Sequence, residues 1–499
     1  DGKNWSIAWS QTYNEGGQYN VIKTINTSDI GKNNVKFCIY FQGNSSTINA
    51  WYFDDLEIIS SVQTDAKAQS IDIADIICAG DNDIIFSIQN TGSDVITSFE
   101  AEFNINNQVI TERFETELAQ YETRQFIFTQ AIKLSPNIYN SELRITSVNE
   151  QEDQNMVNNN VKKIIRVAMN KVQKMPMIEH FSSSTCPPCV NVNFAMASLT
   201  EANPGKYTYT KYPCYWPGTG DPYCNDDART RVAFYACNAA PQIFMDGIDQ
   251  GFSSVTQAAL DEHYATPAFA NVRGAFNVEG NTINVIADFM SYFNMSGMNA
   301  YISINEKTTT GNVGSNGETE FHHILMKMLE DGYGNPLELN AGEYKRFEYS
   351  FDMSSTFVEE MDDLEVSLWI QDTVSGEIFN SHFAYEYTDH CYPVQNLRSA
   401  IVGDCITLHI DWDAPEQGTP VGYNIYVNGE LIEENFTGNS YSDETIAGDL
   451  YDDKHVHIAE VVAVYENGMT SVAAIAIIDN DWINVAETED VNVMIYPNP

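Results

Sequence analysis

The chain has 499 residues, of which 43% are hydrophobic and 12% aromatic, so it is too long for one core and apolar enough for several packed domains. It carries 70 Asp and Glu against 25 Lys and Arg, a formal net charge of −45. This charge makes nucleic acid and anionic membrane surfaces poor partners. Two interpretations of the acidity remain: a solubilising surface in a salty or extracellular setting, or carboxylates that bind Ca²⁺, which prefers oxygen ligands.

The nine cysteines are too few for a disulfide-dense scaffold, and their odd number leaves at least one outside any intrachain pair. Several lie in aromatic, strand-rich surroundings, which fits an oxidising compartment. No apolar run approaches the roughly 20 residues that a membrane-spanning helix needs, so we expect no membrane span.

Residues 1–62 alternate apolar and polar positions over 5–9 and 35–41, a pattern typical of half-buried strands. They close with Trp-Tyr-Phe-Asp-Asp-Leu-Glu-Ile at 51–58, which resembles the end of jelly-roll modules of the cleaved-adhesin and MAM-like type. The region would be the C-terminal half of such a module. The resemblance implies a structural Ca²⁺ near Asp54 and Asp55; the alternative is two exposed acids at a strand edge.

Residues 65–168 contain a second series of short strands separated by Asn- and Gly-rich turns. The Asn-Thr-Gly turn at 90–92 and the Asn-rich segment 153–160 resemble the CARDB-type immunoglobulin-like adhesion module. The resemblance implies a spacer that carries no chemistry.

Residues 172–266 alternate strands with helices, which predicts an α/β layer. We expect, in order, a buried strand at 177–181, a Cys-Pro-Pro-Cys turn at 186–189, a helix, a strand at 207–212, a helix at 226–237, a strand at 242–245 and a helix at 253–264.

The Cys-Pro-Pro-Cys turn before a helix suits disulfide exchange. Free backbone amides and the helix dipole favour the thiolate of Cys186 and lower its pKa. Cys189, one turn later, can resolve a mixed disulfide. The two prolines suit a first helical turn, where no amide donor is needed. Ala240-Pro241, just before the strand at 242–245, supplies a non-helical wall for the pair.

This order, followed by Pro-Gln-Ile-Phe-Met-Asp-Gly at 241–247, resembles a thioredoxin-like domain. The resemblance implies that the bond before Pro241 is cis and faces the disulfide, with Cys186 attacking, Cys189 resolving and Pro241 shaping the substrate groove. Together with 267–388, the region resembles the thioredoxin-like outer-membrane lipoprotein family of bacteria that use type IX secretion. The matching segments of the second half are 314–317, 321–324 and 369–372.

Two positions depart from thioredoxins. His180 stands where they carry a buried acid that relays a proton to the resolving thiol. An imidazole can do this work near neutral pH, or it can be a hydrogen-bonded, half-buried side chain. Thr185 replaces the Trp that usually precedes the first Cys, which weakens the case for general reductase activity. The pair itself is either redox-competent or a static disulfide.

The other cysteines of this region allow two arrangements. Cys214 and Cys224 bracket a Pro- and Gly-rich loop, and a structural disulfide between them leaves Cys237 alone on a helix. By count, Cys186, Cys189, Cys214 and Cys224 are also a set of four zinc ligands.

Residues 267–388 return to strands and predict an antiparallel sandwich. Residues 391–478 resemble a fibronectin type III module through Trp412 and Tyr-Asn-Ile-Tyr-Val-Asn-Gly at 423–429, whose Asn-Gly pair predicts a type I′ hairpin turn. Cys391 and Cys405 would lie on neighbouring strands of this module and form a stapling disulfide.

Residues 479–499 begin as an acidic linker and end in Tyr-Pro-Asn-Pro at 496–499. This motif resembles the opening of the C-terminal sorting domain of type IX secretion substrates. The resemblance implies export by the type IX secretion machinery to the exterior or the outer-membrane surface of a Gram-negative bacterium.

We therefore expect a multidomain, mainly β chain of jelly-roll and immunoglobulin-like sandwiches with one central α/β thioredoxin-like domain. Two functions compete. In the first, the chain is an exported structural or adhesive protein that binds surface proteins or glycans, and the thioredoxin-like domain is a scaffold. In the second, it is an extracytoplasmic thiol–disulfide oxidoreductase. Neither function requires a cofactor, and Ca²⁺ would be structural.

Overall fold

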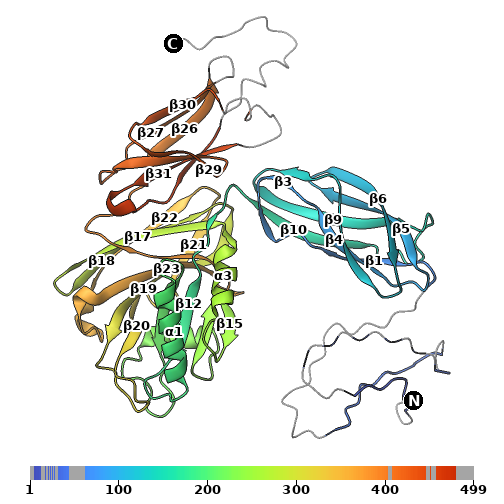
Figure 1. The fold of residues 1–499 in the computed structure, drawn as a ribbon, viewed down its shortest axis with the longest axis horizontal. Coiled ribbons are helices and arrows are strands. Elements are labelled where there is room, and N and C mark those ends of the chain that lie inside the picture. Colours follow the sequence, from blue (N-terminus) through green and yellow to red (C-terminus); the bar gives the residue numbers. More distant parts are fainter. Residues whose placement is uncertain are drawn as a thin grey trace, which may run out of the picture. The chain divides into compact units, whose positions relative to one another are not determined.

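The computed structural model describes residues 5–12, 32–43, 62–402, 407–445, 450 and 457–478, together with isolated positions between 17 and 28 (Figure 1). The chain divides into two compact units. The first comprises residues 1–72, 84–129 and 141–163, and the second comprises 73–83, 130–140 and 164–499. Strands greatly outnumber helices among the described residues, so the prediction of a mainly β, multidomain chain is confirmed.

The strands predicted at 5–9 and 35–41 are not formed in the described residues, so that prediction is wrong. Trp5 and Phe37, which the alternating pattern assigned to a core, are 56% and 48% exposed. A segment of about 60 residues buries too little apolar surface to hold a core of its own. Asp54 and Asp55 lie outside the described residues, as does the segment 479–499.

The first unit packs two antiparallel sheets around phenylalanine side chains. One sheet has the order β1-β4-β7, with β1 (Ala66–Ile71), β4 (Ile85–Asn90) and β7 (Thr123–Ile127). In the other, β5 (Ile96–Ile105) pairs with β6 (Gln108–Leu118) and with residues 141–148 of β9 (Asn137–Val148). Alternating residues of each strand face inward. The core rings are Phe86, Phe99, Phe103, Phe114, Phe126 and Phe128.

The second unit begins with short pairings. Residues Arg166–Ala168 of β10 (Asn160–Ala168) run parallel to β2 (Ile76–Cys78), and β3 (Gly80–Asn82) is antiparallel to β8 (Ile132–Leu134). A two-stranded pairing of β11 (Val172–Gln173) with β16 (Pro267–Ala268) then brackets the α/β region.

Residues 177–265 form a four-stranded layer whose elements follow the predicted order, with one further strand, β15, that was not predicted. They are β12 (Met177–Ser182), α1 (Cys189–Ala202), β13 (Thr208–Pro213), α2 (Asp226–Phe234), β14 (Gln242–Met245), β15 (Ile248–Gly251) and α3 (Gln257–Ala265). The sheet order is β15-β14-β12-β13. β13 is parallel to β12, whereas β14 is antiparallel to β12 and β15 to β14.

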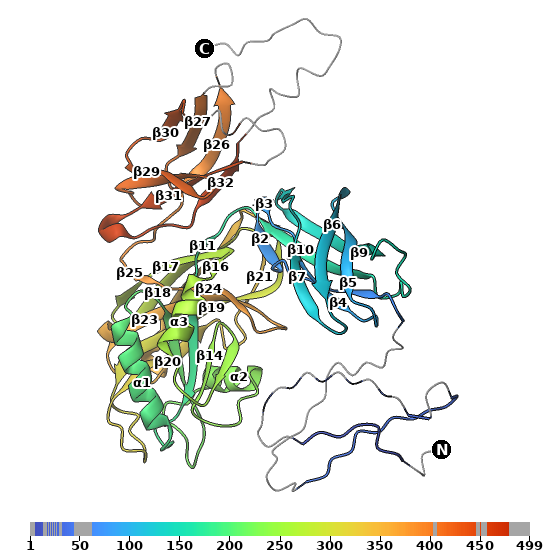
Figure 2. The same cartoon turned by 45° about the vertical axis from the view of Figure 1, so that its right-hand side comes forward.

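Helices cover both faces of this layer (Figure 2). On one face Met196 of α1 and Leu260 of α3 share a core with Ile178. On the other face Val232 of α2 shares a core with Phe181. All residues of β12 and β13 are buried, as expected for strands that are covered on both sides.

The sheet continues beyond β13 into the next part of the chain. β20 (Phe321–Leu329) pairs with β13 in parallel at Lys211↔Ile324. It is followed across the sheet by β19 (Met295–Thr309), β23 (Leu364–Asp372) and β24 (Ile378–Phe383), and β21 (Asn335–Leu339) also pairs with β19. The result is one nine-stranded sheet that crosses the boundary predicted at 266, and it leaves no exposed edge at β13.

A second sheet packs against this one and completes the sandwich. Its order is β22-β18-β17-β25, with β22 (Tyr344–Asp352), β18 (Thr282–Ser291), β17 (Ala270–Glu279) and β25 (Tyr385–Glu386). The core between the two sheets includes Val285, Phe289, Ile302 and Leu368.

Residues 391–478 form a sandwich of two smaller sheets. One has the order β26-β27-β30, with β26 (Gln395–Val402), β27 (Thr407–Asp413) and β30 (Ser440–Asp443). The other has the order β29-β28-β31-β32, with β29 (Glu430–Phe436), β28 (Gly422–Val427), β31 (Ile458–Val464) and β32 (Ala474–Ile477). Asn428 and Gly429, between β28 and β29, both have positive φ, at 50° and 82°, which fits the predicted type I′ turn.

Candidate functional site

Cys186 and Cys189 form a disulfide at the start of α1. β12 ends at Ser182, and the polar turn that follows is held by a hydrogen bond from Thr185 N to Ser183 Oγ. Cys189 is the first residue of α1, and its amide donates to Cys186 O at 3.2 Å. The two residues are 1% and 0% exposed. The pair therefore sits at a helix N-terminus but is shielded from solvent.

Pro241 contributes to the wall of this site. The Ala240–Pro241 peptide bond is cis, and Ala240 O lies 3.3 Å from Cys186 Sγ. In the disulfide this sulfur has no proton, so the approach is a van der Waals contact. In the dithiol the same geometry would let the Cys186 thiol donate to the carbonyl.

His180 is buried among the residues of the α1 and α3 face. Its Nδ1 lies 2.6 Å from Tyr209 Oη, and its Nε2 is buried without a hydrogen-bond partner. Burial, helped by the charge of Lys211, holds the pKa of His180 well below its ordinary value. The imidazole is therefore neutral and a weak base near neutral pH, and it is fully buried rather than half-buried. This geometry favours a structural role over a proton relay.

Glu179 points to the opposite face, as the strand period requires. It pairs with Arg231 of α2 at 2.7 Å, and both side chains are fully buried. Glu179 also accepts hydrogen bonds from the hydroxyls of Tyr212 and Tyr235. Burial alone would lower the pKa of Arg231, but Glu179 and the neighbouring tyrosines hold it well above its ordinary value. Sequence analysis missed this pair.

Lys211 of β13 is a second buried charge that sequence analysis missed. It lies opposite His180 in the parallel register. Burial lowers the pKa of Lys211 to about 8, and the negative charges of Glu318 and Asp221 oppose this shift. Asp221 is itself buried, which raises its pKa, and it accepts a hydrogen bond from Ser184 N at 2.9 Å. A strand pattern alone does not reveal such a cluster, because its acids come from loops.

The connection between β19 and β20 reaches this turn. Asn316 N donates to Ser184 O at 3.0 Å, and Asn193 Nδ2 of α1 lies 3.0 Å from both oxygens of Glu318. Residues from the sandwich therefore complete the surroundings of the disulfide.

The disulfide predicted between Cys214 and Cys224 is not formed, because both residues are thiols, as is Cys237. Burial raises the pKa of all three thiols, to about 12 for Cys237. Since Cys186 and Cys189 are bonded to each other, the four-cysteine zinc set is not assembled either. Among the described residues no group of three or more His, Cys, Asp or Glu could hold a metal ion.

The last predicted cysteine pair is described only in part. Cys391 is a buried thiol whose pKa burial raises to about 12. Cys405 lies outside the described residues.

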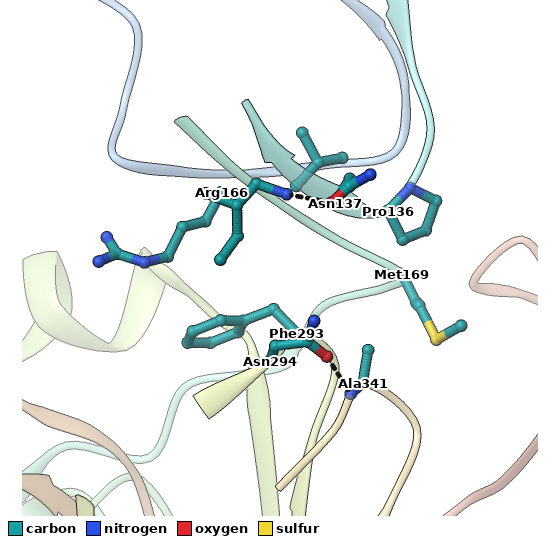
Figure 3. Close-up of a pocket in the computed structure, with 9 residues that line it drawn as sticks. Pro136, Asn137, Arg166, Met169, Phe293, Asn294 and Ala341 are labelled. Atoms are coloured by element: carbon teal, nitrogen blue, oxygen red, sulfur yellow. Dashed lines mark hydrogen bonds between the residues drawn. The ribbon is translucent and has the colours of Figure 1, made fainter. Parts of the chain in front are cut away.

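A cavity of about 110 Å³ lies elsewhere in the second unit (Figure 3). Arg166 is its only charged lining residue, and the guanidinium extends away from Pro136 and Met169 (Figure 3). Ala341 N donates to Asn294 Oδ1 at 2.9 Å along the wall. The remaining lining residues are Asn137, Ile138, Val167 and Phe293. This cavity offers no reactive group.

In the described part of the chain, no helix is long and apolar enough to cross a membrane.

Comparisons with known proteins assign no family. No family model matches the chain, and no curated protein matches it. Similar solved structures include HBP35 of Porphyromonas gingivalis, at 12% identity and a TM-score of 0.36, with 62% of this chain and 99% of that chain covered.

Two further similar structures match smaller parts of the chain. A domain of the outer membrane lipoprotein Omp28 from Porphyromonas gingivalis has 10% identity and a TM-score of 0.18, with 24% of this chain and 88% of that chain covered. The CARDB domain of the PF1109 protein from Pyrococcus furiosus, in complex with di-metal ions, has 15% identity and a TM-score of 0.19, with 23% and 99% covered. At such TM-scores we draw no functional argument from these similarities.

Proposed function

We propose that residues 172–266 form a thioredoxin-like domain whose Cys186–Cys189 disulfide exchanges with substrate thiols. The observation that carries the proposal is the place of this disulfide. It closes the turn between the central strand β12 and the start of α1, with the carbonyl before cis Pro241 against Cys186 Sγ.

The sheet order supports the same proposal. The chain leaves β12 for α1 on one face, and it leaves β13 for α2 on the other. The carboxyl ends of β12 and β13 therefore lie at a topological switch point, where α/β sheets usually place their sites. The residues that follow these two strands include Cys186 and Asp221.

Reduction of the pair balances in two steps. A substrate thiolate attacks Cys186 Sγ, the Cys186–Cys189 bond breaks, and Cys189 leaves as a thiolate that takes up a proton. A second substrate thiol, after losing its proton, attacks the mixed disulfide. The substrate then leaves as a disulfide, and Cys186 leaves as a thiolate that the helix N-terminus stabilises. Two electrons pass from the substrate dithiol to the protein.

The proposed setting is the cell surface or exterior of a Gram-negative bacterium, reached through the type IX secretion machinery. The net charge of −45 and the Tyr-Pro-Asn-Pro motif at 496–499 support this setting. The β modules at 65–168, CARDB-like, and 391–478, fibronectin type III-like, would act as spacers or contact surface proteins or glycans. We also propose that Asp54 and Asp55 bind a structural Ca²⁺.

The second candidate function is a scaffold in which the disulfide is static. The specific observation in its favour is the burial of the pair, at 1% and 0% exposure. In that case the protein is structural or adhesive, and the α/β layer only links its β modules.

Turnover distinguishes the two candidates. The full chain is mixed with insulin and a dithiol reductant, and the precipitation of reduced insulin is followed. We expect the wild type to accelerate precipitation and a Cys186→Ser/Cys189→Ser variant to leave it at the uncatalysed rate. Equal rates for both proteins would favour the scaffold.

A further inference from the structure

The backbone of the turn that carries Cys186 contacts a segment that is distant in sequence. Residues 312–318, which we call the cover, belong to the connection between the end of β19 at Thr309 and the start of β20 at Phe321. The cover lies against the turn that carries Cys186. Gly314 and Asn316 approach the turn itself, and Asn312 and Glu318 approach the neighbouring residues Asp221 and Asn193.

Asn316 makes the densest set of these contacts. Its amide donates to Ser184 O at 3.0 Å. Its Nδ2 lies 3.4 Å from Ser183 O and 3.5 Å from Cys186 O, so that one side chain spans the turn from end to end. The same Nδ2 donates to Glu318 Oε2 at 2.6 Å, which fixes the side chain in this position.

Gly314 is the point of closest approach. A Cβ at this position would lie 2.4 Å from Ser184 O, well inside van der Waals contact. The close approach of the two backbones therefore requires glycine here. Its φ is not in the left-handed region, so substitution by alanine would act through this steric clash rather than through backbone strain.

The two ends of the cover are anchored by polar groups. At one end, Asn312 lies 3.4 Å from Asp221, and the Glu359 carboxylate accepts from Gly311 N at 2.7 Å. At the other end, the Glu318 carboxylate accepts hydrogen bonds from Asn193 Nδ2 of α1. Val313, the only large apolar residue of the cover, is 48% exposed. Since polar contacts rather than buried apolar side chains hold this segment, its opening is less costly than unfolding of the sheet.

We propose that residues 312–318 are a movable cover that controls the access of thiols to the Cys186–Cys189 disulfide, with Asn316 as its latch. Closed, the cover stores the pair oxidised. Open, it exposes the sulfurs at the carboxyl ends of β12 and β13. The biological meaning of the cover rests on the proposed redox function, but the cover itself can be tested by chemical reduction alone.

The test measures how fast dithiothreitol reduces the pair in the full chain. Its thiolate attacks one sulfur and displaces the other, and its second thiol then closes to the cyclic disulfide, leaving Cys186 and Cys189 as thiols. Samples are quenched in acid and alkylated after unfolding, and the two cysteines are quantified by peptide mass spectrometry. The variants are Asn316→Ala and Gly314→Ala, with Ser315→Ala as the control, because Ser315 is an exposed neighbour on the same segment.

We expect Asn316→Ala to be reduced roughly fivefold faster than wild type, since it loses net hydrogen bonding of about 1 kcal/mol. Gly314→Ala should also be faster and Ser315→Ala unchanged. Native alkylation of the buried thiol Cys214 reports general loosening of the fold. Faster reduction at an unchanged Cys214 rate supports the cover. Wild-type reduction rates in both variants, or a parallel rise at Cys214, would overturn it.

The two proposals fail separately. A fast Asn316→Ala variant in a chain without insulin turnover would retain the cover and remove the oxidoreductase. Insulin turnover by the wild type, with no effect of either cover variant on chemical reduction, would do the reverse.

Discussion

The buried pair of Glu179 and Arg231 gives the sharpest test of the α/β layer. Glu179→Ala leaves the Arg231 guanidinium fully buried with no counter-charge, beside the rings of Tyr301 and Trp369 at 4.5 and 5.8 Å. It also removes the acceptor of the Tyr212 hydroxyl. Breaking one partner of a buried pair typically costs about 3–5 kcal/mol, and we expect Glu179→Ala to lose that much free energy of unfolding.

The loss should be much smaller when both charges are removed. A Glu179→Leu/Arg231→Met variant desolvates no ion, so its free energy of unfolding should lie closer to that of the wild type than that of Glu179→Ala does. Glu386→Ala is the control, because its pair with Lys307 is 69% and 42% exposed at the two side chains and should contribute little.

The free energies of unfolding of the wild type and these variants can be compared by urea unfolding, followed by the circular dichroism signal of the helices. The three α-helices of the described residues all lie between 189 and 265, so the signal reports the α/β layer rather than the β modules. A loss of less than about 1 kcal/mol of unfolding free energy in Glu179→Ala would contradict this prediction, since it would mean that Arg231 finds water or another acceptor.

Three other predictions follow from the same structure. Burial raises the pKa of Glu460 to about 7, so the stability that its neutral form contributes is present below pH 4.5 and is lost as pH rises through 7. We expect the wild type to lose roughly 3 kcal/mol of unfolding free energy in this way, and Glu460→Gln should remove most of this loss. Parallel pH–stability curves for the variant and the wild type would contradict this prediction. Cys214, Cys224 and Cys237 should all be alkylated in unfolded, unreduced protein and only slowly in the native state; protection of any two after unfolding would indicate a disulfide. Ca²⁺ should raise the melting temperature of the wild type more than that of Asp54→Asn/Asp55→Asn, and equal shifts would remove that site.

Sequence patterns were sufficient for local structure in the α/β region. The strand expected at 242–245 is β14, and the strand expected at 177–181 is β12 with one more residue. Both segments are short, contain three large apolar residues and directly follow a proline, Pro176 or Pro241, so local preference and tertiary packing agree. At 5–9 and 35–41 the alternation is equally clear, but the described residues form no strand, because alternation cannot supply the second layer that a strand needs.

Contacts between segments that are distant in the chain could not be predicted from the sequence. Arg231 donates to Glu179, which is 52 positions away in sequence, and Asn193 donates to Glu318, which is 125 positions away. The sequence does not reveal that Lys211 is buried, since nothing local distinguishes a buried charge from an exposed one. Cys214 and Cys224 bracket a short loop, but proximity in sequence does not set the direction of the two side chains that a disulfide requires.

Trapping of a mixed disulfide on Cys186 is the most direct test of thiol–disulfide exchange by this protein. Cys189→Ser removes the resolving thiol and leaves Cys186 free to attack a disulfide. The full-length variant is incubated with oxidised glutathione, and the modified cysteines are mapped by mass spectrometry. We expect a glutathione adduct on Cys186 that forms faster than adducts on the buried thiols Cys214, Cys237 and Cys391. An unmodified Cys186 thiol, or adducts that form first on any of these three buried thiols, would contradict this prediction.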